Sequence, residues 1–254
     1  TLVILLIFIV GAFILLVFSS QLSDILKGKT DIETCRLSVL AHAKAKTLPI
    51  VRVDTPRSAI SLDCPRRILK IFEDKVEVND KKSAEYDFNK LTAEDVNRIV
   101  AEELKTCWYM MVEGNRNVFE QSIFFSEGKY YTCLICAEIE FNKNIKPTTF
   151  EGLNDYLKSR KIPEQDLSYF DYLVRSQREI FAYLPYGQYY NPFGYGTRNK
   201  IAEEKINTNE KYLIYFLAMK PAWLVEKTRA YTSAYYIGLG KENKLTEECD
   251  ILVN

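Results

Sequence analysis

The chain has 254 residues with 34 basic and 34 acidic side chains, so its formal net charge at pH 7 is zero when the single histidine is neutral. That balance gives no net positive field toward phosphate groups and argues against a nucleic-acid-binding protein. One histidine is too few for a two-histidine zinc motif or a histidine-rich metal centre. We therefore expect no cofactor and no metal ion.

The chain begins with an almost unbroken apolar run over residues 1–19. A helix of that length extends roughly 30 Å, the thickness of the hydrocarbon core of a bilayer. We expect residues 1–28 to form a transmembrane or filament-core helix that hinges at Gly28 and continues as helix to about Lys46. The side chains expected to pack in an assembled helix are Leu2, Ile4, Ile7, Phe8, Phe13, Ile14 and Phe18.

The apolar run differs from a secretory signal peptide, which carries a basic segment in front and is removed behind its apolar part. If Thr1 is the mature N-terminus, cleavage occurred in front of the run. That arrangement resembles the processing of type IV pilins and archaellins, whose exposed apolar helices bundle into a filament core. The alternative is that a short leader is missing from the sequence and residues 1–19 are an ordinary single-pass anchor.

Six cysteines follow the apolar run: Cys35, Cys64, Cys107, Cys133, Cys136 and Cys249. An even number beyond a membrane segment is typical of disulfides in an oxidising compartment, and the alternatives are cytosolic thiols or a metal site. Cys133 and Cys136 lie three residues apart in a predicted strand, so they project from opposite faces, which disfavours a shared zinc ion. We predict three disulfides, with Cys107 bonded either to Cys133 or to Cys136, in an extracellular domain at residues 29–254.

The rest of the chain predicts an α+β fold with a mainly antiparallel sheet, which can divide into two subdomains near residues 142–150. Thr92 is the predicted cap of the best helix, whose apolar residues repeat at intervals of three and four and predict a buried face. A hairpin is expected at Glu73–Asp74. Strands are predicted at residues 59–63, 68–73, 75–78, 129–141, 212–219, 230–239 and 249–253, helices at 92–112 and 149–160, and a further apolar piece at 167–174.

Three polar features have structural interpretations. Arg66 and Arg67 are adjacent on a predicted strand and would point to opposite sides, which we interpret as a solvated strand edge rather than an anion site. His42 stands alone in an alanine-rich helical stretch and is expected on the surface near the membrane. The segment 238–241 (GLGK) lacks the spacing of a phosphate-binding loop and is interpreted as the end of a strand.

Residues 183–196 (YLPYGQYYNPFGYG) combine tyrosine with glycine and proline, which excludes a regular helix or a central strand. Tyrosine rings bury a large area at a modest entropy cost and suit contact surfaces. The alternative is an irregular loop folded over its own sheet. We predict contact with another subunit, a cell-surface partner or a glycan through Tyr183, Tyr186, Tyr189, Tyr190, Phe193 and Tyr195.

A set of short motifs within residues 1–141 is similar to one group of proteins. The motifs are Cys35-Arg-x-Ser38, Leu62-Asp-Cys64-Pro65, Cys107-Trp108 followed by Glu113-Gly114, and Cys133-x-x-Cys136 followed by Glu138-Ile-Glu-Phe141. Together they resemble uncharacterised, N-terminally anchored surface proteins of DPANN archaea. The resemblance implies an archaeal cell-surface setting with an N-terminal membrane helix, and it brings no catalytic residue.

We therefore expect a non-enzymatic cell-surface structural protein that assembles with copies of itself through the N-terminal helix, as a subunit of a pilin-like filament or surface assembly. The alternative is a membrane-tethered extracellular receptor for a ligand or carbohydrate, with the aromatic segment as its site. A filament requires repeated subunits with their helices in the centre, whereas a receptor requires a concave aromatic pocket.

Overall fold

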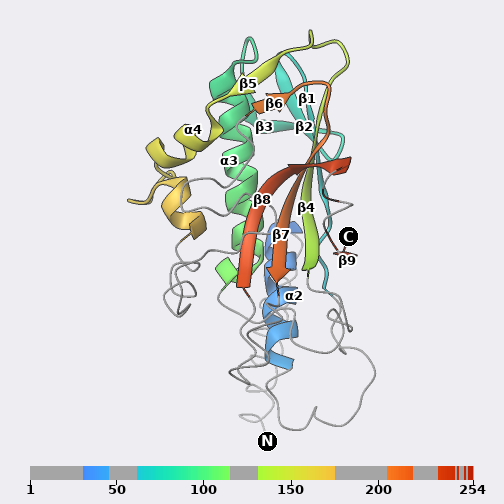
Figure 1. The fold of residues 1–254 in the computed structure, drawn as a ribbon, viewed down its shortest axis with the longest axis vertical. Coiled ribbons are helices and arrows are strands. Elements are labelled where there is room, and N and C mark those ends of the chain that lie inside the picture. The colour runs from blue at the N-terminus through green and yellow to red at the C-terminus, as the bar shows by residue number, and fades with distance from the viewer. Residues whose placement is uncertain are drawn as a thin grey trace, which may run out of the picture.

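The computed structural model describes residues 31–45, 62–114, 131–174, 205–219, 234–243, 245, 249 and 251–253. These residues form an α+β fold in which helix α3 (Ala93–Met110) lies against one face of a seven-stranded sheet (Figure 1). No helix among them is long and apolar enough to cross a membrane. The predicted helix contacts between residues 2 and 18 and the aromatic segment 183–196 lie outside the described residues and stay predictions.

The strands are arranged in the order β3-β2-β1-β4-β7-β8, with β9 paired to β4 beside this path. Among the described strands, β1 and β9 pair with β4 in parallel and the other pairings of the sheet are antiparallel, so the sheet is mixed. The strands are β1 (Arg67–Ile71), β2 (Lys75–Val78), β3 (Lys81–Asp87), β4 (Tyr131–Phe141), β7 (Tyr212–Met219), β8 (Ala234–Lys241) and β9 (Ile251–Val253).

Strand β4 has a different neighbour at each end of one edge. β1 pairs with residues 137–141 and β9 with residues 132–134, while β7 occupies the other edge. The register with β7 shifts between Ile135 and Ala137, which places one extra residue in β4. Such a bulge reverses the alternation of side chains. Cys136 and Ile139 therefore both face the core under α3, although they are an odd number of residues apart.

The other face of the sheet carries a second, smaller apolar cluster. Its buried members are Cys133, Ile135, Leu213, Tyr215, Leu217 and Leu245. The main core contains residues from both sides of the segment 142–150, among them Trp108, Leu157 and Leu173. The predicted division into two subdomains stays a prediction.

Helix α2 (Asp31–Ala45) is the described part of the long helix that the sequence predicts. Cys35, Val39 and His42 follow one another at intervals of four and three residues and are all buried. Because this spacing places them on one helix face, which packs toward α3, His42 cannot lie on the surface. The expectation of an exposed histidine is wrong.

The cap predicted for α3 is present. The Thr92 hydroxyl accepts a hydrogen bond from the Asp95 backbone N–H at 3.2 Å, and the Asp95 carboxylate accepts one from the Thr92 backbone N–H at 3.1 Å. This reciprocal pair satisfies amides that the first turn leaves unbonded. The stripe predicted from the apolar spacing is buried along the length of the helix, from Val96 to Trp108.

Other predicted elements need correction. The helix predicted at 149–160 is divided by Gly152 into strand β5 (Thr149–Glu151), which pairs with β6 (Lys205–Asn207), and helix α4 (Leu153–Ser159). Gly152 has φ of 88°, a left-handed backbone that interrupts a helix. In the strand predicted at 59–63, the described residues 62 and 63 are not in a strand. The further apolar piece at 167–174 is helical over residues 169–174.

Strand β3 was not predicted, although its turn has a recognisable signal. Asn79 and Asp80 link β2 to β3 with φ of 51° and 61°. Asparagine and aspartate tolerate this left-handed backbone better than other residues with a side chain, and they favour two-residue hairpins. The charged residues Lys81 and Lys82 obscured the strand, because a solvated edge strand lacks the apolar alternation on which the prediction relied.

The segment 238–241 belongs to β8, as its interpretation as a strand end requires. Tyr215 in β7 lies opposite Gly238, and a Cβ atom added at Gly238 would lie 2.7 Å from the Tyr215 hydroxyl oxygen. At Gly240 the closest approach of an added Cβ would be 3.4 Å, to the same ring. The missing side chain at Gly238 thus makes room for the ring.

We expect Gly238→Ala to lower the free energy of unfolding by about 1–3 kcal/mol, because the added methyl group overpacks the Tyr215 ring. Gly240→Ala is the matched control on the same strand and should change stability by less than about 1 kcal/mol. Urea denaturation of both variants measures the difference. Equal stability of the two variants would contradict the proposed packing.

Candidate functional site

The six cysteines form three disulfides, and none is free. Cys35 in α2 bonds to Cys64, just before β1, and Cys107 in α3 bonds to Cys136 in β4. Cys133, on the other face of β4, bonds to Cys249 shortly before β9. The predicted opposite orientation of Cys133 and Cys136 is confirmed, and the partner of Cys107 is Cys136.

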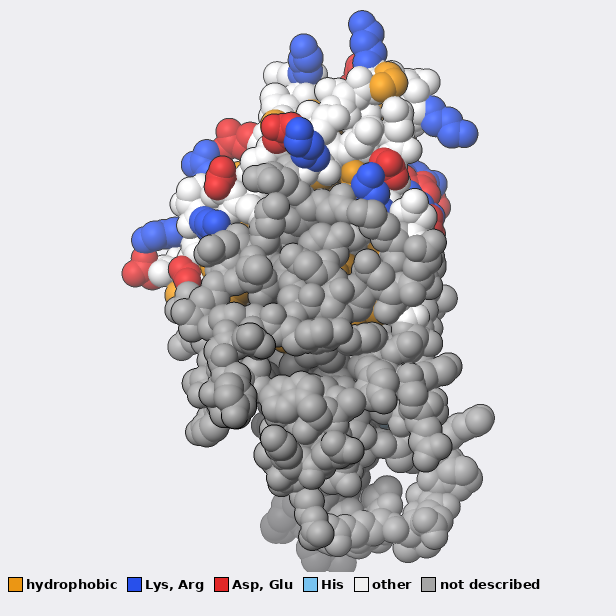
Figure 2. Space-filling model, viewed as in Figure 1, with side chains coloured by type: hydrophobic (Ala, Val, Ile, Leu, Met, Phe, Trp, Pro, Cys, Tyr) orange, Lys and Arg blue, Asp and Glu red, His pale blue; other side chains and the backbone are white. Residues whose placement is uncertain are grey.

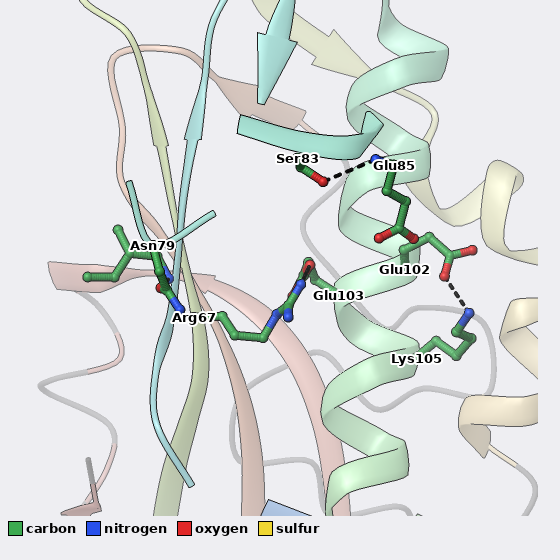
Figure 3. Close-up of polar contacts among 8 residues, drawn as sticks. Arg67, Asn79, Ser83, Glu85, Glu102, Glu103 and Lys105 are labelled. Atoms are coloured by element: carbon green, nitrogen blue, oxygen red, sulfur yellow. Dashed lines mark hydrogen bonds and ion pairs between the residues drawn. The ribbon is translucent and has the colours of Figure 1, made fainter. Parts of the chain in front are cut away.

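Arg67 forms a two-point ion pair with a buried carboxylate. Its Nε and one terminal nitrogen donate to the two carboxylate oxygens of Glu103 at 2.9 and 2.8 Å, and Figure 3 shows the guanidinium pointing from β1 to α3. The Glu103 side chain is only 1% exposed. Burial raises the pKa of the Glu103 carboxyl, and the Arg67 guanidinium opposes that rise. Removing either partner of such a pair strongly destabilises the protein, because the other charge stays buried without a partner.

Arg66 is anchored on the opposite face of the sheet. Its guanidinium donates to the Glu138 carboxylate at 3.1 Å, and the Lys211 ammonium approaches the same carboxylate to 2.5 Å. Lys211 also lies 3.1 Å from Glu140 and 3.6 Å from Glu242. Burial alone would raise the pKa of Glu138, but Lys211 and Arg66 outweigh it and hold that pKa below its usual value.

The interpretation of Arg66 and Arg67 as a solvated strand edge is therefore wrong, although their opposite orientation is as expected. Each arginine contacts a carboxylate that is largely buried. The acidic partners are 72 and 36 residues away in the sequence, so no local pattern could identify them. We name these two residues, with Glu138 and Glu103, the arginine anchor.

A third polar cluster joins α2 to the end of α3. The Arg36 guanidinium lies 3.9 Å from the centre of the Tyr109 ring, donates to the Tyr109 carbonyl, and is 3.9 Å from the Glu113 carboxylate. The Tyr109 hydroxyl donates to Glu33 at 3.0 Å, and the Tyr172 hydroxyl donates to Glu113 at 3.3 Å. Stacking and charge together hold α2 against the domain.

The backbone is strained next to this cluster. α3 is followed by a short 3-10 element, η2 (Val112–Gly114), in which Val112 and Glu113 have φ of 54° and 57°. A left-handed backbone is costly for a β-branched residue such as valine, so surrounding contacts must hold it. The ion pair of Glu113 with Arg36 and the hydrogen bond that Glu113 accepts from Tyr172 supply such contacts. Tyr172 lies in the last described stretch before residues 175–204.

The described surface mixes charges of both signs. On the face shown in Figure 2, lysine and arginine side chains are interspersed with aspartate and glutamate over its described part. The described residues include no group of three histidine, cysteine or acidic side chains placed to hold a metal ion, and the disulfide-bonded cysteines offer no thiolates to one. The comparisons with family models, curated proteins and solved structures found no match for this chain.

We expect Arg67→Met to lower the free energy of unfolding by about 3–5 kcal/mol, because it leaves the Glu103 carboxyl buried without its partner. The double variant Arg67→Met/Glu103→Leu should recover most of the loss. Lys70→Met on the same strand is the control, since its pair with Asp80 is exposed and little change is expected. Additive effects of the two core substitutions in a urea double-mutant cycle would contradict the coupling.

The lowered pKa of Glu138 predicts a pH dependence. A carboxyl whose pKa is lower in the folded state stabilises the protein above its unfolded-state pKa, and the contribution is lost as pH falls through the folded-state pKa. Lys211→Met should therefore reduce the loss of stability on acidification between about pH 5 and pH 3. Urea midpoints across that range measure it. Lys158→Met, which removes an exposed lysine on α4, should retain the wild-type slope.

Proposed function

We propose that this chain is a non-enzymatic cell-surface structural protein, whose α+β domain assembles with copies of itself through the apolar segment 1–19. The observation that carries the proposal is the pairing of all six cysteines across α2, α3, β4 and Cys249. Disulfides of this kind persist in oxidising compartments and are rare in the cytosol. They support a domain that works outside the cytoplasm.

The assembly part of the proposal rests on the apolar segment. A helix that is apolar on all sides must be covered by lipid or by neighbouring helices, because its exposure to water would cost tens of kcal/mol at about 25 cal/mol per Å². In the proposed pilin-like arrangement, copies of the same helix supply that cover. In this proposal, residues 1–19 lie either in the membrane or in the core of a filament.

The described part of the chain shows how α2, which follows that segment in sequence, is attached to the domain. α2, which follows the segment in sequence, is bonded to the domain by the Cys35–Cys64 disulfide and held by Arg36 on Tyr109. This covalent bond, one turn inside α2, fixes the start of α2 on the domain, and the hinge predicted at Gly28 lies between α2 and the apolar segment.

A second candidate function is that of a membrane-tethered receptor for a glycan or another surface ligand. The observation in its favour is the composition of residues 183–196, since rigid aromatic rings with glycine and proline suit contact surfaces. The two candidates differ in what the apolar segment touches. A receptor needs lipid around it, whereas an assembly subunit needs other copies.

We expect Ile7→Glu to abolish high-molecular-mass assemblies, because a buried carboxylate in a helix bundle lacks water and a partner. Asn209→Glu adds the same charge at an exposed turn and should assemble like the wild type. Electron microscopy and sedimentation of the full chain released from membranes measure the difference. Single, detergent-dependent particles of the wild-type chain would contradict assembly and leave the tethered receptor.

A further inference from the structure

The three disulfides follow one another along a single short path through the domain. The first crosses from Cys35 to Cys64, after which the chain itself runs to Cys107. The second crosses from Cys107 to Cys136, three residues from Cys133, and the third crosses from Cys133 to Cys249. The loops that they close have sequence separations of 29, 29 and 116.

We propose that this path is a covalent strap that limits how far the domain can extend under tension. The proposal rests on the proposed function. A domain that is held at residues 1–19 comes under tension whenever a force acts on another part of it. The shortest covalent route from Cys35 to Cys249 passes through the three disulfides. Along the backbone it includes only residues 64–107 and residues 133–136. All other residues in that interval belong to closed loops and bear no tension.

The extensible segment 64–107 is held by non-covalent contacts at the place where tension enters. Tension from α2 reaches Cys64 through the disulfide and then acts on Arg66 and Arg67, which lie two and three residues further along the chain. These two arginines bind Glu138 in β4 and Glu103 in α3, on opposite faces of the sheet. The arginine anchor therefore locks the start of the segment from both sides.

The rest of the segment is also firmly packed. β1 carries Leu69 and Ile71 into the core with no exposed surface, and α3 ends the segment with its buried stripe and its capped first turn. Cys107, at the far end, is bonded to Cys136. The segment 64–107, which no disulfide spans, thus has a disulfide-bonded cysteine at each end.

The test is a single-molecule pulling experiment on the full chain. Residues 1–19 are embedded in a lipid nanodisc, and force is applied through a tag behind residue 254. In the oxidised protein, unfolding of the domain should release roughly 160 Å, for about 46 residue steps at about 3.5 Å each. After reduction the release should rise about fivefold, to roughly 750 Å for the whole interval from Cys35 to Cys249. A release of that larger size from the oxidised protein would overturn the strap.

The role of the arginine anchor is tested in the same experiment with Arg67→Lys, which keeps the charge but loses the two-point geometry. The released length should stay the same, while the lifetime of the folded domain under constant force should fall about tenfold, the equivalent of about 1.4 kcal/mol. Lys70→Met on the same strand is the control and should leave the lifetime unchanged. An unchanged lifetime in both Arg67→Lys and Arg66→Met would refute the claim that the arginine anchor holds the start of the segment under tension.

The strap and the proposed function can fail separately. A chain that forms assemblies but extends over its full length in the oxidised state refutes the strap alone. A chain that releases the short length but never assembles refutes the proposed function alone, because the released length depends only on the disulfides.

Discussion

Strand β4 is crosslinked on both of its faces, and the other elements are arranged around that constraint. Cys136 fixes the face that carries α3, and Cys133 fixes the face that carries the smaller apolar cluster. The bulge next to Cys136 changes the alternation of β4 so that its second half still turns apolar residues to α3 and acids to the other side. Because β1, β7 and β9 all pair with β4, the position of each depends on this one strand.

Covalent and non-covalent stabilisation are divided between different parts of the chain. A disulfide acts largely by restricting the unfolded chain, and in the chain-entropy model loops of this size contribute about 3–5 kcal/mol each. The interval from Cys64 to Cys107 has no such restriction within it. It instead contains the buried Arg67–Glu103 pair and the cap at Thr92, while exposed ion pairs such as Lys161–Asp166 add little.

The sequence predicted what depends on near neighbours in the chain. The cap at Thr92, the hairpin after β1 and the opposite orientation of Cys133 and Cys136 all follow from spacings of a few residues. The sequence did not predict the parallel pairing of β1 with β4 or the carboxylate partners of Arg67 and Arg36, because these contacts join residues far apart in sequence. His42 was misplaced because its polar side chain was taken as the sign of an exposed position, although its spacing from Cys35 and Val39 places it on their face of the helix. Of the candidate site residues, the structure places the six cysteines.

The order of the disulfides also determines what a protease can do to the domain. A single cut anywhere between Cys35 and Cys64, or between Cys107 and Cys249, leaves both pieces joined by at least one disulfide. The tyrosine-rich residues 183–196 lie within the second interval, so cleavage there would not shed either piece. Between Cys35 and Cys249, only a cut between Cys64 and Cys107 separates the pieces, and there the chain is folded into β1, β2, β3 and α3. A single extracellular cut inside either disulfide-closed interval, 35–64 or 107–249, thus leaves the protein one covalent molecule.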